Sequence, residues 1–382
     1  MKRALKFLTA GLALACWCNL AGADLAAEKL TVEDLKPATP HRLYLADIVL
    51  EHVLDGRVHI IDGENFEYRG LIATGLFGVS ALSADSSELY VATTYYTKRN
   101  RGKRFDQFEA YSTTDLSLKM EIEIPAKHAQ ALGYKGTIMG SSDGRFVFIQ
   151  NATPASSITI IDRKAEKVTA EIATPGCWIA LPAKSNPKRF STLCGDGTVL
   201  TITLNDQGEA ASQARSAKLF DAETDPLFVQ ADHIGDTNYF VSYEGNIHEI
   251  NLGGDVAKTE STWSLLNDED KAAHWKPGGY QLLAVHDKTR RLYIAMHDGA
   301  RDGSHKLPAK EIWVFDLDSK QRVHRAAGNN AIALTLTKED APTLYVYDGL
   351  HAKFHKYVTQ PALKPVAESP RFGDFATLFE SH

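Results

Sequence analysis

The stretch GTIMGSSDGRFVFIQNATPASSITIIDRKAEKVTAEIAT, residues 136–174, decides the fold. It contains four apolar runs, GTIMGSS, RFVFIQN, SITIID and KVTAEIAT, and short polar segments separate them. Runs of this length, rich in β-branched and aromatic residues and bounded by turn residues, are typical of β-strands. The stretch therefore predicts one unit of four consecutive antiparallel strands.

The same four-strand pattern recurs along the chain. Its third strand is the easiest to recognise because it ends in Asp or Asn, whose side chains start turns by hydrogen bonding to the backbone. Successive third strands are separated by roughly 43–65 residues, and four strands per period of about this length indicate a β-propeller. The third strands are VHIID (58–62), FEAYSTTD (108–115), ITIID (158–162), VLTITLN (199–205), NIHEIN (246–251), IWVFD (312–316) and, more weakly, FHKYV (354–358).

Counting these units predicts an all-β fold, a seven-bladed β-propeller of four-stranded antiparallel blades over residues 41–382, preceded by an N-terminal tail (24–40). The first blade (about 41–74) shows only three strands. We therefore expect GDFATLFE (373–380) to be its innermost strand. That pairing would close the ring and remove open sheet edges.

Two insertions lengthen the loops of this pattern. The first, YTKRNRGKRFD (96–106), is predicted to be a loop. Its basic string RNRGKR (99–104) is either solvated or a contact for an acidic partner. The second, WSLLNDEDKAAHWKPGG (263–279), predicts a short helix with Asn267 as N-cap, stopped by Pro-Gly-Gly. Such insertions lie on propeller faces, where partners bind.

Residues 1–23 have the three-part pattern of a secretory signal peptide. A basic start (Lys2, Arg3 and Lys6) is followed by FLTAGLALACW (7–17), which is too short to span a bilayer, and by Ala21-Gly22-Ala23. A lipoprotein anchor at Cys16 is the rival interpretation, but its sequence context is poor. We expect an exported, soluble mature chain.

The charge of the chain argues against two classes of partner. The net charge is −6, and removal of residues 1–23 would make it about −9 by formal counting. An acidic exported protein is a poor nucleic-acid binder and has no basic patch for a membrane surface. We expect neither partner.

Cys177 and Cys194 are the only cysteines after residue 18. They lack the CxxC spacing of metal or redox sites. CWIALPA and RFSTLC read as two strands around the turn KSNP, and a hairpin centred on Ser185-Asn186 places the two cysteines opposite each other. In an oxidising compartment this arrangement predicts a structural disulfide.

No catalytic set is visible in the sequence. HAKFH (351–355) has the spacing of a zinc pair but lacks the Glu of HExxH, and we interpret it as two surface histidines. His286, His297 and His305 lack supporting carboxylates for a metal site. The apolar pair Leu76-Phe77, in ATGLFGVSAL, is by itself more typical of core than of function. We expect no catalytic, cofactor-binding or metal-binding residue on this chain.

Several strings resemble the heavy subunit of the quinoprotein amine dehydrogenases, the methylamine and aromatic amine enzymes. They follow in order across most of the mature chain, and RGKR and WSLLNDEDK are nearer to the aromatic amine branch. The strings are TTYYTKRNRGKR (93–104), GCW…LCGDG (176–197), WSLLNDEDKAAHWKPGGY (263–280) and HKLPAKEIWVFD (305–316).

The resemblance implies the heavy chain of a periplasmic α2β2 enzyme that oxidises primary amines. Its small, disulfide-rich light subunit carries tryptophan tryptophylquinone and the catalytic base. The acceptor of the electrons is a blue-copper protein of the azurin or amicyanin type. A heavy-subunit phenylalanine at the substrate channel corresponds to either Leu76 or Phe77, and Cys177 and Cys194 match the family's heavy-chain disulfide.

Two other functions remain open from the residues. One is a free-standing exported propeller hydrolase of the lactonase kind, which would need acidic and Asn ligands converging on the central tunnel. The innermost strands GVSAL, TIMGS, WIALP, FVQAD and LLAVH offer only scattered candidates. The other is a propeller used solely for protein interaction.

Overall fold

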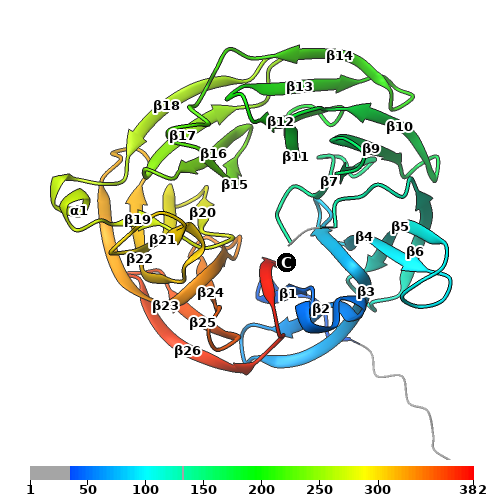
Figure 1. Cartoon of the computed structure of the whole chain (residues 1–382). Coiled ribbons are helices and arrows are strands. Elements are labelled where there is room, and N and C mark those ends of the chain that lie inside the picture. The colour runs from blue at the N-terminus through cyan, green and yellow to red at the C-terminus, as the bar shows by residue number, and fades with distance from the viewer. Residues whose placement is uncertain (1–34, 131–132) are drawn as a thin grey trace, which may run out of the picture. The chain divides into compact units, whose positions relative to one another are not determined.

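The structure is a computed structural model that describes residues 35–130 and 133–382. The predicted signal peptide (1–23) lies outside these residues. Within the unit Leu35–His382, β-sheets surround a common centre in a β-propeller-like arrangement (Figure 1). Among the described residues, no helix is both long and apolar enough to cross a membrane.

The chain begins and ends in one seven-stranded sheet of order β27-β1-β2-β3-β4-β5-β6. Every neighbouring pair in this sheet is antiparallel. Its strands are β1 (Arg42–Asp47), β2 (Gly56–Asp62), β3 (Glu67–Leu82), β4 (Glu88–Tyr96), β5 (Arg104–Ser112), β6 (Leu118–Ile124) and β27 (Ala376–Ser381).

Three four-stranded antiparallel sheets follow along the chain. The first contains β7 (Ile138–Gly140), β8 (Phe146–Asn151), β9 (Ser157–Asp162) and β10 (Lys167–Ala173). The second contains β11 (Cys177–Pro182), β12 (Arg189–Cys194), β13 (Val199–Leu204) and β14 (Ala210–Arg215). The third contains β15 (Leu227–Ile234), β16 (Thr237–Ser242), β17 (Asn246–Asn251) and β18 (Lys258–Ser264).

The last sheet has eight strands, and three short helices connect strands within residues 35–130 and 133–382. The strands are β19 (Lys276–Pro277), β20 (Leu283–His286), β21 (Arg291–His297), β22 (Ala309–Asp316), β23 (Arg322–Leu336), β24 (Thr343–Asp348), β25 (Lys353–Val358) and β26 (Lys364–Arg371). The helices are η1 (Leu50–Asp55), α1 (Asp268–Ala272) and η2 (Ser304–Lys306).

Two long strands, β3 and β23, each belong to two groups of four strands. The first part of β3 pairs with β2 and its second part with β4, and β23 in the same way pairs with β22 and then β24. At each of these two places the four-strand repeat predicts two separate strands, the outermost strand of one unit and the innermost strand of the next. The structure joins them into one strand without a loop.

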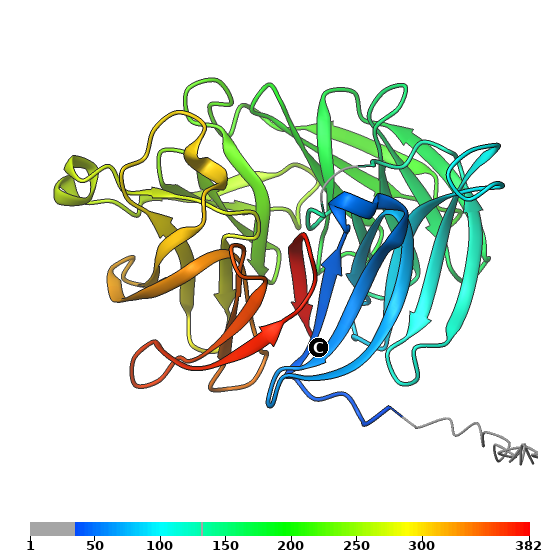
Figure 2. The ribbon, with the colours of Figure 1, turned by 60° about the horizontal axis from the view of Figure 1, so that its bottom comes forward.

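The C-terminal strand lies beside the first strand of the unit. β27 pairs antiparallel with β1, with Leu45 opposite Phe379 and Ala46 opposite Leu378, and Figure 2 shows the two strands side by side. Phe379 is fully buried, and its ring contacts that of Phe354 in β25. The last residues therefore contribute to the core.

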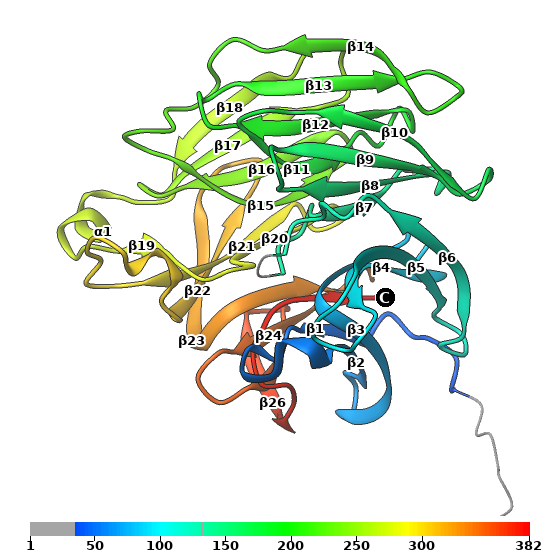
Figure 3. The ribbon, with the colours of Figure 1, turned by 45° about the vertical axis from the view of Figure 1, so that its right-hand side comes forward.

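The core lies between neighbouring sheets. Sheets β7–β10 and β11–β14 are adjacent (Figure 3), and the ring centroids of Phe148 and Phe190 are 4.6 Å apart between them. Both rings are fully buried. All residues of β8 and all but the first of β12 are buried, so both faces of these strands are covered.

The predicted disulfide is present. Cys177 on β11 lies opposite Cys194 on β12, and their sulfur atoms are bonded. The predicted pairing is confirmed, although the register is not constant along the hairpin. It shifts by one residue between Trp178 and Leu181, with Leu181 opposite Ser191, so a bulge lies between the turn and the cysteine pair.

Removing this disulfide should destabilise the chain. The double variant Cys177→Ala/Cys194→Ala is expected to lose about 3 kcal/mol of unfolding free energy, because a closed loop of this size restricts the unfolded state. Urea unfolding with and without reductant would measure the loss. Reductant should destabilise the parent protein and leave the double variant unchanged. A parent protein insensitive to reductant would contradict the prediction.

Helix α1 confirms one prediction and corrects another. The Asn267 side chain accepts a hydrogen bond from the Asp270 backbone, and the Asp270 carboxylate accepts one from the Asn267 backbone, which forms a capping box. The helix ends at Ala272, well before Pro277. The prediction that Pro-Gly-Gly stops it is wrong, because the left-handed backbone of His274 (φ 55°) has already ended the helical path.

Candidate functional site

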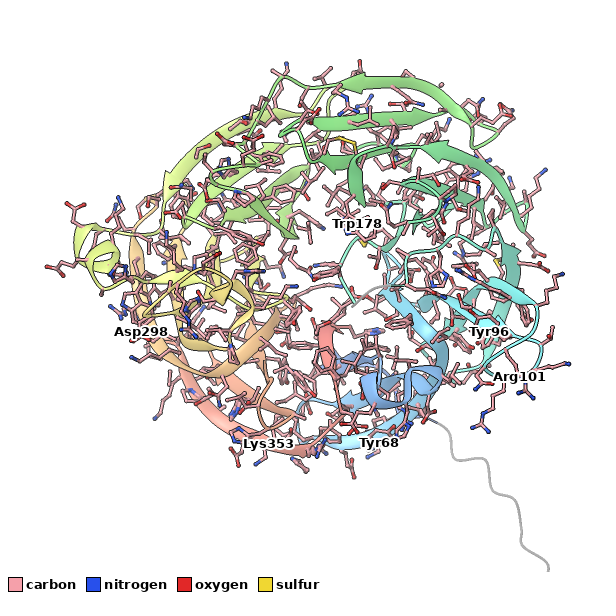
Figure 4. All side chains as sticks on the ribbon, in the orientation of Figure 1. Tyr68, Tyr96, Arg101, Trp178, Asp298 and Lys353 are labelled. Atoms are coloured by element: carbon pink, nitrogen blue, oxygen red, sulfur yellow. A yellow bond between two sulfur atoms is a disulfide. The ribbon has the colours of Figure 1, made fainter. Side chains whose placement is uncertain are left out.

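A cavity of about 660 Å³ lies beside the seven-stranded sheet. Three segments line it: helix η1, the middle of β3, and the end of β4 with the loop that follows. The lining residues are Glu51, His52, Val53, Leu54, Asp55, Gly75, Leu76, Thr94, Tyr95, Tyr96 and Arg99. Figure 4 labels Tyr96 and Arg101, which mark the loop after β4.

The two residues of the predicted channel pair differ in their position relative to the cavity. Leu76 lines the cavity, whereas Phe77 is not among the lining residues. Both side chains are half-buried. Phe77 has a positive φ of 49°, which is uncommon for a bulky residue. The register with β4 shifts between Leu76 and Val79, so the pair sits in a β-bulge.

Glycines on either side allow this bulge. A Cβ atom on Gly75, whose φ is +58°, would lie 2.8 Å from Cε1 of Tyr95, and one on Gly78 would lie 2.2 Å from the carbonyl oxygen of Thr74. Neither position has room for a side chain. Bulges re-aim neighbouring side chains. The GLFG stretch thus turns Leu76 into the cavity.

A buried polar network lies behind the cavity wall. Thr94 donates a hydrogen bond to Oδ1 of Asp106 (2.7 Å), Arg104 donates to both carboxylate oxygens (2.8 and 2.7 Å), and Nδ1 of His128 lies 2.8 Å from Oδ2. Gln130 donates to the Thr94 hydroxyl at 2.9 Å. The network joins β4, β5 and the segment after β6.

Asp106 is the charged centre of this network. It is fully buried. Burial by itself raises the pKa of the Asp106 carboxyl, but hydrogen bonds from His128 and Arg104 outweigh burial and hold that pKa well below its usual range. The carboxylate is therefore ionised at neutral pH. It holds Thr94, a wall residue of the cavity, in place.

No sequence motif pointed to this network. Asp106 falls within the predicted loop 96–106, but that prediction is wrong at both ends. β4 continues to Tyr96 and β5 begins at Arg104, so the loop contains only residues 97–103. The basic side chains of that loop are exposed.

The histidines singled out in the sequence do not converge. Nδ1 of His286 lies 2.9 Å from the Thr289 hydroxyl, Nδ1 of His297 lies 3.3 Å from the Asp298 carbonyl oxygen, and His305 stacks on Tyr243. In the HAKFH string, His351 and His355 both lie near Asp348, at 2.8 and 3.5 Å. Over residues 35–130 and 133–382, no group of three or more His, Cys, Asp or Glu residues could hold a metal ion.

Sequence comparison relates this chain to one family. Residues 39–361 match the family described as methylamine dehydrogenase heavy chain. The methylamine dehydrogenase heavy chain of Methylophilus methylotrophus is 25% identical over 345 residues, which cover 88% of this chain and 84% of that protein. The corresponding protein of Methylorubrum extorquens is 24% identical over 332 residues, 85% of this chain and 80% of that protein.

Solved structures share the fold. Kuenenia stuttgartiensis hydrazine synthase superposes with a TM-score of 0.56 at 13% identity, covering 88% of this chain and 99% of that chain. A candidate 6-phosphogluconolactonase from Bacteroides uniformis superposes with a TM-score of 0.60 at 10% identity, covering 89% and 98%. At these identities the likeness concerns the fold alone.

Proposed function

Because the chain belongs to the methylamine dehydrogenase heavy chain family, we propose that it is the heavy subunit of an amine dehydrogenase that oxidises primary, mainly aromatic, amines. A light subunit carries tryptophan tryptophylquinone and the catalytic base in an α2β2 assembly. The reaction would convert a primary ammonium and water into an aldehyde and ammonium with release of two protons and two electrons, and the quinone of the light subunit would supply the oxidant. An azurin- or amicyanin-type blue-copper protein then accepts these electrons.

The cavity beside Leu76 is the observation that carries this proposal. It lies in the segment where the resemblance places the family's channel residue, and its walls include Leu54, Leu76, Tyr95 and Tyr96. Apolar and aromatic walls suit an aryl group, because most ligand pockets bury apolar surface against such side chains. We infer that this heavy chain lines the substrate channel and supplies no catalytic residue.

The fold proposed for this subunit is a seven-bladed propeller. The first half of β3 would be the outermost strand of one blade, and its second half the innermost strand of the next blade. β23 would be divided in the same way, and β27 would supply the innermost strand of the first blade. The pairing of β27 with β1 supports a closed ring.

The light subunit would cover the end of the sheets that carries the cavity. Figure 2 shows η1, the loop after β4 and the η2 loop at this end. Leu50 in η1 and Leu307 after η2 are large apolar residues that remain 47% and 40% exposed. Loops held by a rigid scaffold often carry the residues that contact a partner. Such an assembly would be periplasmic, with residues 1–23 as the export signal.

Isolation of the heavy chain tests this proposal. We expect the chain alone to be colourless and inactive toward amines. Co-expressed with a light chain of the family, it should co-purify with that small cysteine-rich protein as a coloured complex that oxidises benzylamine. A visible spectrum and an amine-dependent dye-reduction assay would measure both properties. Amine oxidation by the isolated chain would contradict the proposal, and lactone hydrolysis by it would favour the hydrolase alternative.

A further inference from the structure

Tyr95 forms a wall of the cavity next to Leu76. Its ring leaves no space beside Gly75, where a Cβ atom would lie 2.8 Å from Cε1 of Tyr95. On another side, the ring of Phe105 has its centroid 5.8 Å from that of Tyr95. The tyrosine ring is therefore confined between the β3 bulge and β5.

Glu109 anchors the far end of this ring. The Tyr95 hydroxyl donates a hydrogen bond to Oε1 of Glu109 at 2.8 Å, and the Tyr111 hydroxyl donates to Oε2, also at 2.8 Å. The Glu109 residue is only 4% exposed. Burial, followed by the nearby Glu109 charge, raises the pKa of Tyr95, so its hydroxyl remains a donor at neutral pH. Hydrogen bonds to a buried carboxylate are stronger than those between neutral groups.

We propose that Tyr95 is a specificity-determining residue of the amine channel and that Glu109 is the positioning residue that fixes it. This inference rests on the proposed function. A ring held at its hydroxyl and at its edge presents a flat surface of fixed position beside Leu76. An aryl substrate gains from such a surface, because aromatic rings contact each other in defined geometries, whereas a small alkylamine gains little.

A matched pair of variants tests the inference in the complete heavy- and light-subunit enzyme. Tyr95→Phe and Tyr111→Phe each remove one hydroxyl from Glu109, but only Tyr95 lines the cavity. Tyr95→Phe should lower the ratio of kcat/KM for benzylamine to that for methylamine by about fivefold, the effect of one lost hydrogen bond. The change should appear mainly in KM for benzylamine. Tyr111→Phe should keep the parent ratio.

Variants of Glu109 distinguish a role in positioning Tyr95 from a role in the stability of the fold. Glu109→Ala should change the ratio in the same direction as Tyr95→Phe, and Glu109→Gln, which keeps an oxygen acceptor, should restore it. An unchanged ratio in Tyr95→Phe, or equal changes in both tyrosine variants, would overturn the inference while amine oxidation continues. If the proposed function is wrong, the result is different from these outcomes, because the parent complex then oxidises neither amine.

Discussion

The variant Leu76→Ala is expected to change substrate preference by about tenfold or more, because each methylene in an apolar pocket is worth roughly 1–3 kcal/mol in discrimination. Leu76 lines the cavity, and its truncation adds room without removing any group that makes or breaks bonds. The ratio of kcat/KM for bulky aryl amines to that for small alkyl amines should rise. Steady-state kinetics of the complete enzyme with benzylamine and methylamine would measure it.

Phe77→Ala is the matched control for this prediction. Phe77 is the neighbouring apolar residue in the same bulge, but it is not among the cavity-lining residues. Its truncation should leave the substrate ratio near the parent value. A ratio that moves only in Phe77→Ala would make Phe77 the channel residue. If both variants lose about 2–5 kcal/mol of stability with the ratio unchanged, the pair serves packing alone.

Asp106→Ala is expected to destabilise the fold by about 1–3 kcal/mol, because it leaves the buried His128 and Thr94 without their hydrogen-bond acceptor. Arg104 is partly exposed, so water can solvate its guanidinium in the variant. Urea unfolding would measure the difference. Asp115→Ala is the control, since the Asp115 carboxylate is exposed, accepts hydrogen bonds from the neighbouring Ser117 and forms only a surface ion pair with Lys119. A loss no larger than that of the control would contradict the prediction.

The pH dependence of stability gives a second readout for Asp106. Its pKa is lowered in the folded protein, so its contribution to stability is fully present above the unfolded-state pKa of about 3.9. The contribution is lost as the pH falls below that value toward the lower folded-state pKa. Asp106→Ala should therefore differ from the parent protein most at neutral pH, and the difference should shrink progressively below about pH 4. A difference that is constant with pH would assign the effect to packing.

Local signals made part of this fold predictable. The Cys177–Cys194 pairing was expected from two short strands and one turn, whereas the register shift between Trp178 and Leu181 had no signal in the sequence. The N-cap of α1 was equally local, since Asn267 and Asp270 are three residues apart. In both cases the interacting residues are neighbours in the chain or in one hairpin.

The polar networks beside the cavity were not predictable, for two physical reasons. Asp106 and His128 come from different segments, and only the packing of those segments brings them together. Glu109 lies in a strand whose sequence, FEAYSTTD, fits the repeat well, so nothing marks it as a buried anchor. Whether a strand face is covered depends on the neighbouring sheets, which the local sequence does not encode.

The pairing of β1 with β27 has a consequence for the order of folding. Ala46 meets Leu378, so nearly the whole chain lies between these two partners, and this contact closes a very large loop. Contacts so distant in sequence form late and slow folding, because the chain loses conformational entropy in closing the loop before the contacts can stabilise it. Until β27 pairs with β1, the backbone groups on that edge of β1 have no partner. A folding intermediate that lacks this pairing would therefore expose a strand edge that favours aggregation.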